Sequence, residues 1–347
     1  MPTAQNNYFD VKPNYLGSIG SVKSNEIING NGLPSSPVSL EVEVTSRCPL
    51  NCIHCSAKGG ESKLDLPLHL FEEIVDSAKR LGISNFDILG GEPFSRPDIF
   101  ELLKLAVDNI PSVVVNTSGF FSSEKMLKKI IDTGVKNIFV SIDGQNEEKN
   151  DKIRGTGSFK RACDAVKRFV ESGLNVTISF VATASSYKDI PAMAELCEEL
   201  GVSNLFVLRF IPEGRAKAKS YYKIPPDSIS DLKRFVRIAE AKSKTNITLD
   251  CSVDGGNTST SSLPVCPAGV LFSSIRNDGE VFPCGFLRDY KVFSCGNISD
   301  NKLEDIWKHG AGYKYFRNIT DDNGKFCLKN FKGDCPAAYV GELLDSS

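Results

Sequence analysis

A repeating pattern of short apolar runs and amphipathic segments begins at residue 38 and constrains the fold more than any other feature of the sequence. Each unit has a run rich in β-branched residues, a turn rich in glycine or serine, and then a segment with helical periodicity. The pattern predicts an α/β fold. The six expected strands cover residues 38–44, 85–89, 112–116, 137–142, 175–182 and 204–210. The expected helices cover residues 68–81, 98–109, 123–133, 159–172, 190–200 and 227–244.

Strands and helices that alternate in this way form parallel sheets with right-handed crossover connections. Six units predict a partial (β/α)6 barrel, TIM-like but not fully closed, over residues 38–245. Residues 1–37 are polar and rich in Asn, Gly and Ser, which predicts an N-terminal extension without a core of its own. Residues 246–347 contain a hairpin pattern with its turn at Asp278 and Gly279, and a helix pattern that ends near Trp307. This region is expected to form a small, cysteine-rich α+β domain.

The charge balance excludes two classes of partner. The chain has 41 basic and 43 acidic residues, so it lacks the basic excess that a nucleic acid or an anionic membrane surface would attract.

The first ten residues have neither a basic segment nor an apolar segment of the kind found in signal peptides. No run approaches the roughly 18 apolar residues of a membrane span. We therefore expect a cytoplasmic protein that binds neither nucleic acid nor membrane.

Polar and glycine-rich turns follow the predicted strands on one side of the sheet. In parallel α/β sheets the functional residues gather at the carboxyl ends of the strands. Each of these turns is ordinary when it is taken alone. Together they predict an active site on this rim. The turn after the first strand contains three cysteines. The expected site residues of the later turns are Gly90, Gly91 and Glu92 after the second strand, Asn116 and Thr117 after the third, Ser141 and Asp143 after the fourth, and Arg209 after the sixth.

Eleven cysteines also need an explanation, because a reducing cytosol disfavours a disulfide framework and favours metal binding or catalysis. Cys48, Cys52 and Cys55 have the spacing Cys-x3-Cys-x2-Cys. Structural zinc needs four ligands, and the fourth would have to be His54, whose position beside Cys55 makes it a poor partner. A four-iron four-sulfur cluster with three thiolates leaves one iron open. That iron could bind a substrate or a cofactor directly.

This cysteine motif at the end of a first strand, in a partial barrel, resembles the signature of the radical SAM enzymes. The resemblance covers roughly residues 38–340. It implies that Cys48, Cys52 and Cys55 bind a catalytic 4Fe-4S cluster whose open iron is chelated by the amino and carboxylate groups of S-adenosylmethionine. It also implies reductive cleavage to methionine and a 5'-deoxyadenosyl radical, which takes a hydrogen atom from the substrate. In such enzymes the cofactors carry the difficult chemistry and the protein positions them.

The same resemblance assigns roles to the other rim residues. Gly90, Gly91 and Glu92 match the family's GGE motif, in which glycines allow close approach and Glu92 is expected to receive the ammonium group of the methionine moiety. His54 is expected to pack against the adenine rather than to transfer a proton. Short polar side chains suit the ribose hydroxyls, and an arginine pairs with the methionine carboxylate. The remaining expected cofactor-binding residues are Asn116, Thr117, Ser141, Asp143, Arg154, which resembles that family arginine, and Arg209.

A second set of cysteines lies in the last hundred residues. Cys266-x12-Gly279-x4-Cys284 resembles the opening of the SPASM and twitch extensions, which hold auxiliary iron–sulfur clusters. The tail is depleted, because Asn330 stands where a further cysteine could follow Cys327, so the resemblance implies one auxiliary 4Fe-4S cluster. Its expected ligands are Cys266, Cys284, Cys335 and, as the fourth, Cys327, for which Cys251 and Cys295 compete. Cys295 could instead be a buried thiol.

The motifs leave three hypotheses about the function of the chain. The first is a peptide maturase that crosslinks, epimerises or dehydrogenates a ribosomally made peptide, while the auxiliary cluster takes the second electron. Residues 1–37 are too short for a leader-recognition domain, so a separate protein or an exposed strand edge would recognise the peptide. An electron donor such as flavodoxin or ferredoxin is also expected. The second hypothesis is an enzyme acting on a sugar, an aminocyclitol or a porphyrin-like substrate. The third, a non-enzymatic iron–sulfur protein, leaves Glu92 and the ribose-type residues unexplained.

Overall fold

The computed structural model describes residues 34–250, 268–317 and 335. The strands among these residues form one sheet in the order β10-β9-β8-β1-β2-β3-β4-β5-β6-β7. The strands are β1 (Ser39–Thr45), β2 (Asn85–Gly90), β3 (Ser112–Thr117), β4 (Asn137–Ser141), β5 (Asn175–Ala182), β6 (Asn204–Arg209), β7 (Asn246–Leu249), β8 (Phe272–Ile275), β9 (Glu280–Phe282) and β10 (Gly296–Asn297).

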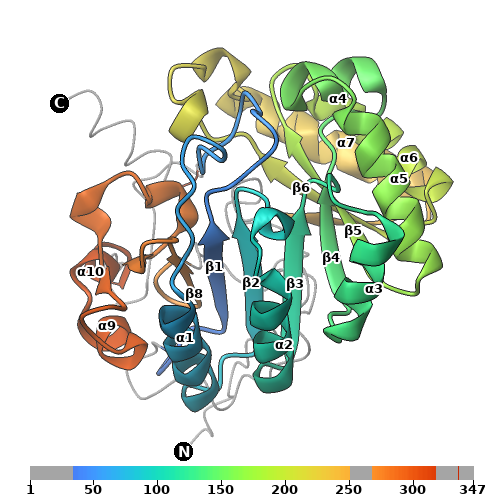
Figure 1. Ribbon diagram of the computed structural model, residues 1–347. Helices are drawn as coiled ribbons and strands as arrows, with labels where there is room; N and C mark the ends of the chain where they lie inside the picture. The colour runs from blue at the N-terminus through green and yellow to red at the C-terminus, as the bar shows by residue number, and fades with distance from the viewer. Residues whose placement is uncertain (1–33, 251–267, 318–334, 336–347) are drawn as a thin grey trace, which may run out of the picture.

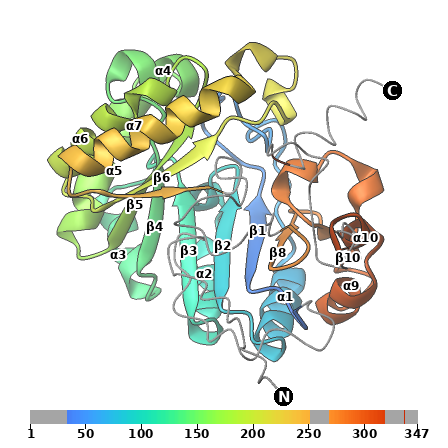
Figure 2. The same cartoon turned by 180° about the vertical axis from the view of Figure 1, so that it is seen from behind.

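Helices cover the outer, convex face of this curved sheet, as Figures 1 and 2 show. They are α1 (Leu68–Arg80), α2 (Ile99–Asn109), α3 (Glu124–Asp132), α4 (Glu147–Arg154), α5 (Ser158–Glu171), α6 (Ile190–Glu199) and α7 (Ile229–Lys242), with α9 (Leu303–His309) and α10 (Ala311–Arg317) near the end of the chain. In the described part of the chain, no helix combines the length and the apolar character that a membrane crossing needs.

The predicted barrel is confirmed. Strands β1 to β7 pair in parallel with their sequence neighbours, and buried residues of successive strands lie in register, such as Val42 opposite Ile88 and Ile88 opposite Val115. All six expected strands and all six expected helices are present, with ends that shift by up to two residues. The barrel sheet continues past the boundary expected at residue 245, because β7 pairs with β6.

Helix α4 is absent from the sequence-based expectations, and its local contacts explain why. Its segment, Glu147–Arg154, is strongly polar and lacks an apolar stripe. The helix begins instead with a cap, since the Asn146 side chain accepts a hydrogen bond from the Lys149 amide at 3.0 Å. Glu147 and Glu148 in the first turn add a favourable interaction with the helix dipole.

The predicted hairpin is also confirmed, but it is not separate from the barrel. β8 and β9 pair antiparallel around a turn in which Gly279 has a φ of +84°. β8 also pairs in parallel with β1, with Ser39 opposite Phe272 and Val42 opposite Ile275. Figures 1 and 2 both show α9 and α10 beside this edge of the barrel. The C-terminal part is therefore built directly onto the strand that leads into the cysteine loop.

Candidate active site

A cavity of about 400 Å³ lies within the curve of the sheet and reaches the carboxyl ends of the strands. The structure brings most of the predicted site residues to its wall. The predicted residues that line it are Cys48, Cys52, Cys55, Gly90, Gly91, Asn116, Thr117, Ser141, Arg154, Arg209, Cys284 and Cys335. Glu92 and Asp143 are fully buried and do not line the cavity. Cys266 and Cys327, together with the competing Cys251, lie outside the described residues.

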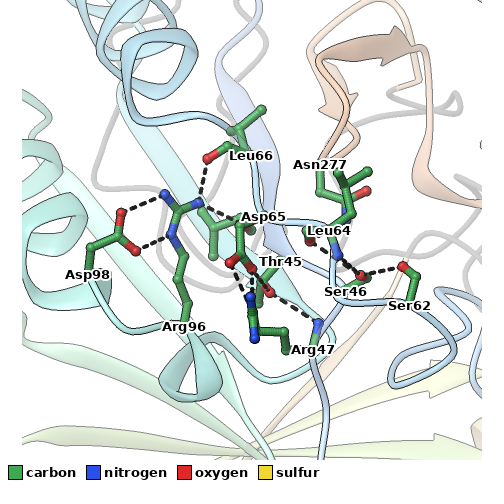
Figure 3. Close-up of polar contacts among 11 residues, drawn as sticks. Thr45, Ser46, Arg47, Ser62, Leu64, Asp65, Leu66, Arg96, Asp98 and Asn277 are labelled. Atoms are coloured by element: carbon green, nitrogen blue, oxygen red, sulfur yellow. Dashed lines mark hydrogen bonds and ion pairs between the residues drawn. The ribbon is translucent and has the colours of Figure 1, made fainter.

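The loop that follows β1 carries the three cysteines and returns to the strand at Asp65. An antiparallel bridge joins Thr45 to Asp65, and the Thr45 hydroxyl donates to the Asp65 carboxylate at 2.5 Å. Nε of Arg47 lies 3.0 and 2.9 Å from the two carboxylate oxygens of Asp65 (Figure 3). These contacts close the base of the loop.

Arg96 fixes both ends of the cysteine loop. Its guanidinium is buried and donates to the carbonyl oxygens of Val44 and Leu66, each at 2.7 Å, so it joins the strand before the loop to the segment after it (Figure 3). Asp98 binds the same guanidinium through both of its oxygens. Such a paired, bidentate arginine is well suited to hold two backbone segments in place.

Gly90 and Gly91 lie directly against the backbone of the cysteine loop. A Cβ atom on Gly90 would overlap the carbonyl oxygen of Thr45, and one on Gly91 would overlap that of Arg47. The Gly91 amide donates to the Thr45 carbonyl oxygen at 2.7 Å. Both glycines line the cavity, and the structure gives a reason for them besides the predicted approach to a cofactor, since the cysteine loop occupies the space of their missing side chains.

Cys48, Cys52 and Cys55 all line the cavity, and Cys52 is buried. The pKa of the Cys48 thiol is raised to about 12, mainly by burial, with smaller contributions from the charges of Glu92, Cys52 and Cys55. Burial also raises the pKa of Cys52. Neutral thiols are therefore favoured until a cationic centre replaces their protons. The Gly59 amide donates to Sγ of Cys55 at 3.3 Å, a contact of the kind that stabilises cluster sulfurs.

Glu92 ties the turn after β2 to the end of β3. Its carboxylate accepts hydrogen bonds from the Thr117 hydroxyl at 2.8 Å, from the Ser118 amide at 2.7 Å and from the Ser118 hydroxyl at 2.5 Å. Burial raises its pKa, although the Ser118 hydrogen bonds act in the opposite direction. These contacts place Thr117 at the cavity wall. The predicted role of Glu92 as the partner of an ammonium group stays a prediction.

Asp143 forms a buried network with two residues of the cavity wall. Its Oδ2 atom lies 2.7 Å from Nε2 of His54 and 2.5 Å from Nε of Arg154, and its Oδ1 atom accepts from the Val181 amide at 2.8 Å. Burial would raise the pKa of Asp143, but the charge of Arg154 and the contact with His54 hold it below its usual value. Asp143 was expected at the ribose, and its pairing with His54 was missed because no local spacing signals a contact between such distant positions. The carboxylate orients His54 and Arg154, and its predicted role at the ribose stays a prediction.

The second cysteine set reaches the same cavity. Cys284 and Cys335 line it, and their role as ligands of an auxiliary cluster stays a prediction. Cys295 does not line it and packs against Gly310 and Gly312. Burial raises the pKa of Cys295 to about 12, which agrees with the alternative interpretation of a buried thiol.

Carboxyl groups inside the barrel were also missed. Glu41 and Glu43 on β1 line the cavity with Asp87 and Asp250, and Arg288 forms an ion pair with Glu43. Burial raises the pKa of Glu41 to about 8 and that of Asp87 to about 7, with the charges of Asp87 and Asp250 adding to the shift of Glu41. A signal was present, because the two glutamates alternate with apolar residues along β1 and so share one face of the strand.

Comparison with known proteins agrees with this geometry. Residues 42–197 match the radical SAM superfamily, and residues 266–336 match SPASM, an iron–sulfur cluster-binding domain. The AdoMet-dependent heme synthase of Methanosarcina barkeri is 27% identical over 345 residues, covering 90% of this chain and 96% of that protein. The mycofactocin maturase MftC of Mycolicibacterium smegmatis is 29% identical over 321 residues, covering 89% of this chain and 81% of that protein.

A solved structure shows the same fold. Streptococcus suis SuiB, bound to its precursor peptide SuiA, superposes with a TM-score of 0.72 at 20% identity, and the match covers 90% of this chain and 74% of that one.

Proposed function

We propose that this chain, which belongs to the radical SAM superfamily and carries a C-terminal SPASM domain, oxidatively modifies a ribosomally made peptide. It is an enzyme that binds a 4Fe-4S cluster with S-adenosylmethionine, and an auxiliary iron–sulfur cluster. When bound, these groups supply radical chemistry that removes a hydrogen atom from the substrate. The proposed product is a crosslinked or dehydrogenated peptide that has lost two hydrogens.

One observation carries the proposal, namely that the two cysteine sets line a single cavity. Cys52 and Cys55 lie on the loop after β1, and Cys284 lies just after β9. A substrate in this cavity faces both sets at once. Loss of two hydrogens requires one hydrogen atom to be abstracted and a further electron and proton to leave. Two cluster sites on one cavity suit that requirement.

The cavity wall favours a peptide over a tetrapyrrole that carries several carboxylates. Sequence identity to the heme synthase and to the maturase is nearly equal, so it does not decide between these two substrates. Four guanidinium groups line the cavity, and all of them have partners. Arg154 binds Asp143, Arg288 binds Glu43, Arg215 binds backbone carbonyl oxygens, and Arg209 also makes an interaction. The lining also contains four carboxyl groups. Such a wall offers poor charge compensation to a polycarboxylate, whereas the Glu41 and Asp87 carboxyl groups, when protonated, can donate hydrogen bonds to peptide carbonyls.

A small metabolite such as a sugar or an aminocyclitol is the second candidate substrate. The cavity volume of about 400 Å³ falls within the usual range of small-molecule sites, which favours this alternative. If the substrate is a peptide, only one or two of its side chains would enter the cavity. A separate recognition protein and an electron donor such as flavodoxin or ferredoxin are part of the proposal.

Anaerobic reconstitution tests the proposal. We expect about eight irons per chain and release of 5'-deoxyadenosine under reduction. Candidate precursor peptides encoded beside the gene, aminocyclitols and tetrapyrroles are then compared as substrates. The proposal predicts that one peptide loses two hydrogens in step with 5'-deoxyadenosine release, measured by mass spectrometry, and that Cys52→Ala abolishes both. Turnover of a tetrapyrrole or an aminocyclitol without peptide modification would overturn it.

A further inference from the structure

Residues 213–215 follow β6 and lie between the two cysteine sets. On one side they bind the cysteine loop. The Arg215 amide donates to the Cys55 carbonyl oxygen at 3.0 Å, and its guanidinium donates to those of Cys52 at 2.9 Å and Gly59 at 2.7 Å. Gly214 has a φ of +61°, and a Cβ atom there would overlap the backbone of Ser56. The loop after β6 therefore packs against the cysteine loop at backbone distance.

On the other side, the same loop binds the segment that carries Cys284. The Tyr290 hydroxyl donates to a carboxylate oxygen of Glu213 at 2.9 Å, and this contact is buried. Nζ of Lys217 lies 5.1 Å from the centre of the Tyr290 ring, within the range of a cation–π interaction. Tyr290 connects back to Cys284 through two turn hydrogen bonds, one from its amide to Leu287 and one from the Leu287 amide to Cys284, each at 3.0 Å.

The two residues before Tyr290 reinforce this arrangement. Arg288 forms a buried ion pair with Glu43 on β1. Asp289 lies 2.7 Å from Nζ of Lys58 in the cysteine loop. Three consecutive residues thus bind three different parts of the barrel. In Figures 1 and 2 the yellow loop after β6, the blue loop after β1 and the orange C-terminal segment lie together at the same end of the molecule.

We propose that Glu213, Arg215 and Tyr290 are positioning residues, and that they form a bridge which fixes the Cys284 segment relative to the cysteine loop. Each side-chain hydrogen bond of the bridge has one charged partner, either the Arg215 guanidinium or the Glu213 carboxylate, and the Tyr290–Glu213 contact is buried. Charge-assisted hydrogen bonds of this kind are stronger than neutral ones and hold geometry better. Its effect on catalysis rests on the proposed function, since a substrate between two cluster sites must meet both at the correct distance. A displacement of about 1 Å at a reacting centre can cost ~10²-fold in rate.

The variant Tyr290→Phe removes the bridging hydroxyl and keeps the ring. Tyr313→Phe is a matched control, because its hydroxyl is also buried and lies 2.6 Å from Oγ of Ser273, but its partner belongs to the C-terminal part itself. Hydrogen–deuterium exchange of the reconstituted protein provides a readout that needs no substrate. Tyr290→Phe is expected to raise exchange both in residues 284–290 and in residues 52–59, whereas Tyr313→Phe leaves residues 52–59 unchanged. Unchanged exchange of residues 52–59 in Tyr290→Phe overturns the bridge.

Two variants of Glu213 provide a second comparison of hydrogen–deuterium exchange. Glu213→Gln keeps an oxygen that accepts the Tyr290 hydroxyl and is expected to restore wild-type exchange, whereas Glu213→Ala is expected to behave like Tyr290→Phe. With a substrate in hand, the ratio of product to 5'-deoxyadenosine should fall about 10-fold or more in Tyr290→Phe and stay constant in Tyr313→Phe. If no peptide is modified but the exchange results hold, the proposed function fails and the bridge stands. If exchange in Glu213→Ala matches the wild type, the bridge fails.

Discussion

Nε2 of His54 lies 2.7 Å from Oδ2 of Asp143, although 89 positions separate the two residues in the sequence. The Asp143 side chain is fully buried, and that of His54 is 9% exposed. Arg154 at the end of α4 binds the same carboxylate oxygen. One carboxylate therefore holds together the loop after β1, the turn after β4 and helix α4 at the edge of the cavity.

The first prediction concerns the stability that this carboxylate provides. Asp143→Asn leaves the Arg154 guanidinium buried without its countercharge and places an amide donor against two other donors. Breaking a buried pair in this way costs about 3–5 kcal/mol in the free energy of unfolding. Urea denaturation measures the loss. Asp108→Asn, which removes one partner of the exposed Lys104–Asp108 pair, is the control and should change stability by less than about 1 kcal/mol. Equal effects of the two substitutions would contradict the assigned role.

The second prediction follows from the raised pKa of Glu41, which burial moves from 4.5 to about 8. The folded protein holds this proton more tightly than the unfolded chain does, so the contribution of Glu41 to stability falls as the pH rises from about 4.5 to about 8. Glu41→Gln removes the titration. The free energy of unfolding of the Glu41→Gln variant, relative to that of the wild type, should therefore increase by a few kcal/mol between pH 5 and pH 8.5, measured by denaturation at both values. Glu124→Gln on the exposed start of α3 controls for the loss of one carboxyl group. A constant difference between wild type and Glu41→Gln would refute the pKa shift.

Periodicity and turn chemistry were sufficient to predict most of the barrel. The β5 segment was predicted at the residues that it occupies, Asn175–Ala182, because it alternates β-branched and polar residues between clear turn signals. Helix α4 was missed because capping and charge stabilise it rather than an apolar face. The strand pairing of β8 with β1 was missed because it joins residues more than two hundred positions apart, and no local pattern carries that information.

The candidate site shows the same difference between residues that local motifs predict and long-range contacts that they do not. Short motifs after the strands were sufficient to predict that the three cysteines, the two glycines and most of the rim residues lie at one site, and the structure brings them to one cavity. The hydrogen-bond partners of Asp143 and Glu92 could not be predicted, since each carboxylate binds a residue of a separate loop. The alternation of Glu41 and Glu43 with apolar residues along β1 indicates that they share one face of the strand. Their place on the cavity wall with Asp87 depends on the curvature of the sheet, which no local pattern predicts.

The third prediction tests the contact between the turn after β2 and the cysteine loop. Gly91→Ala would force a methyl group against the Arg47 carbonyl oxygen and displace the loop. We expect the iron content of the reconstituted protein to fall by about four per chain, because the three proposed ligands of the SAM-binding cluster lie on this loop. Gly82→Ala is the control. Gly82 has a φ of +68° and no atom within 4 Å of an added Cβ, so it should cost about 1–2 kcal/mol and leave the iron content unchanged. Full iron content in Gly91→Ala would show that the loop tolerates the methyl group.

The last prediction separates the auxiliary ligands from the buried thiol. Cys284→Ala removes a thiol that lines the cavity, so iron content should fall by about four per chain while 5'-deoxyadenosine is still released in part and product formation stops. Cys295→Ala provides the contrast, because Cys295 packs on Gly310 and Gly312 outside the cavity lining. Its replacement should lower stability by about 1 kcal/mol, in line with a small cavity in a packed core, and leave the iron content and the product yield unchanged. Loss of four irons in Cys295→Ala would instead identify Cys295 as the fourth ligand, and full turnover in Cys284→Ala would remove the auxiliary site from the reaction.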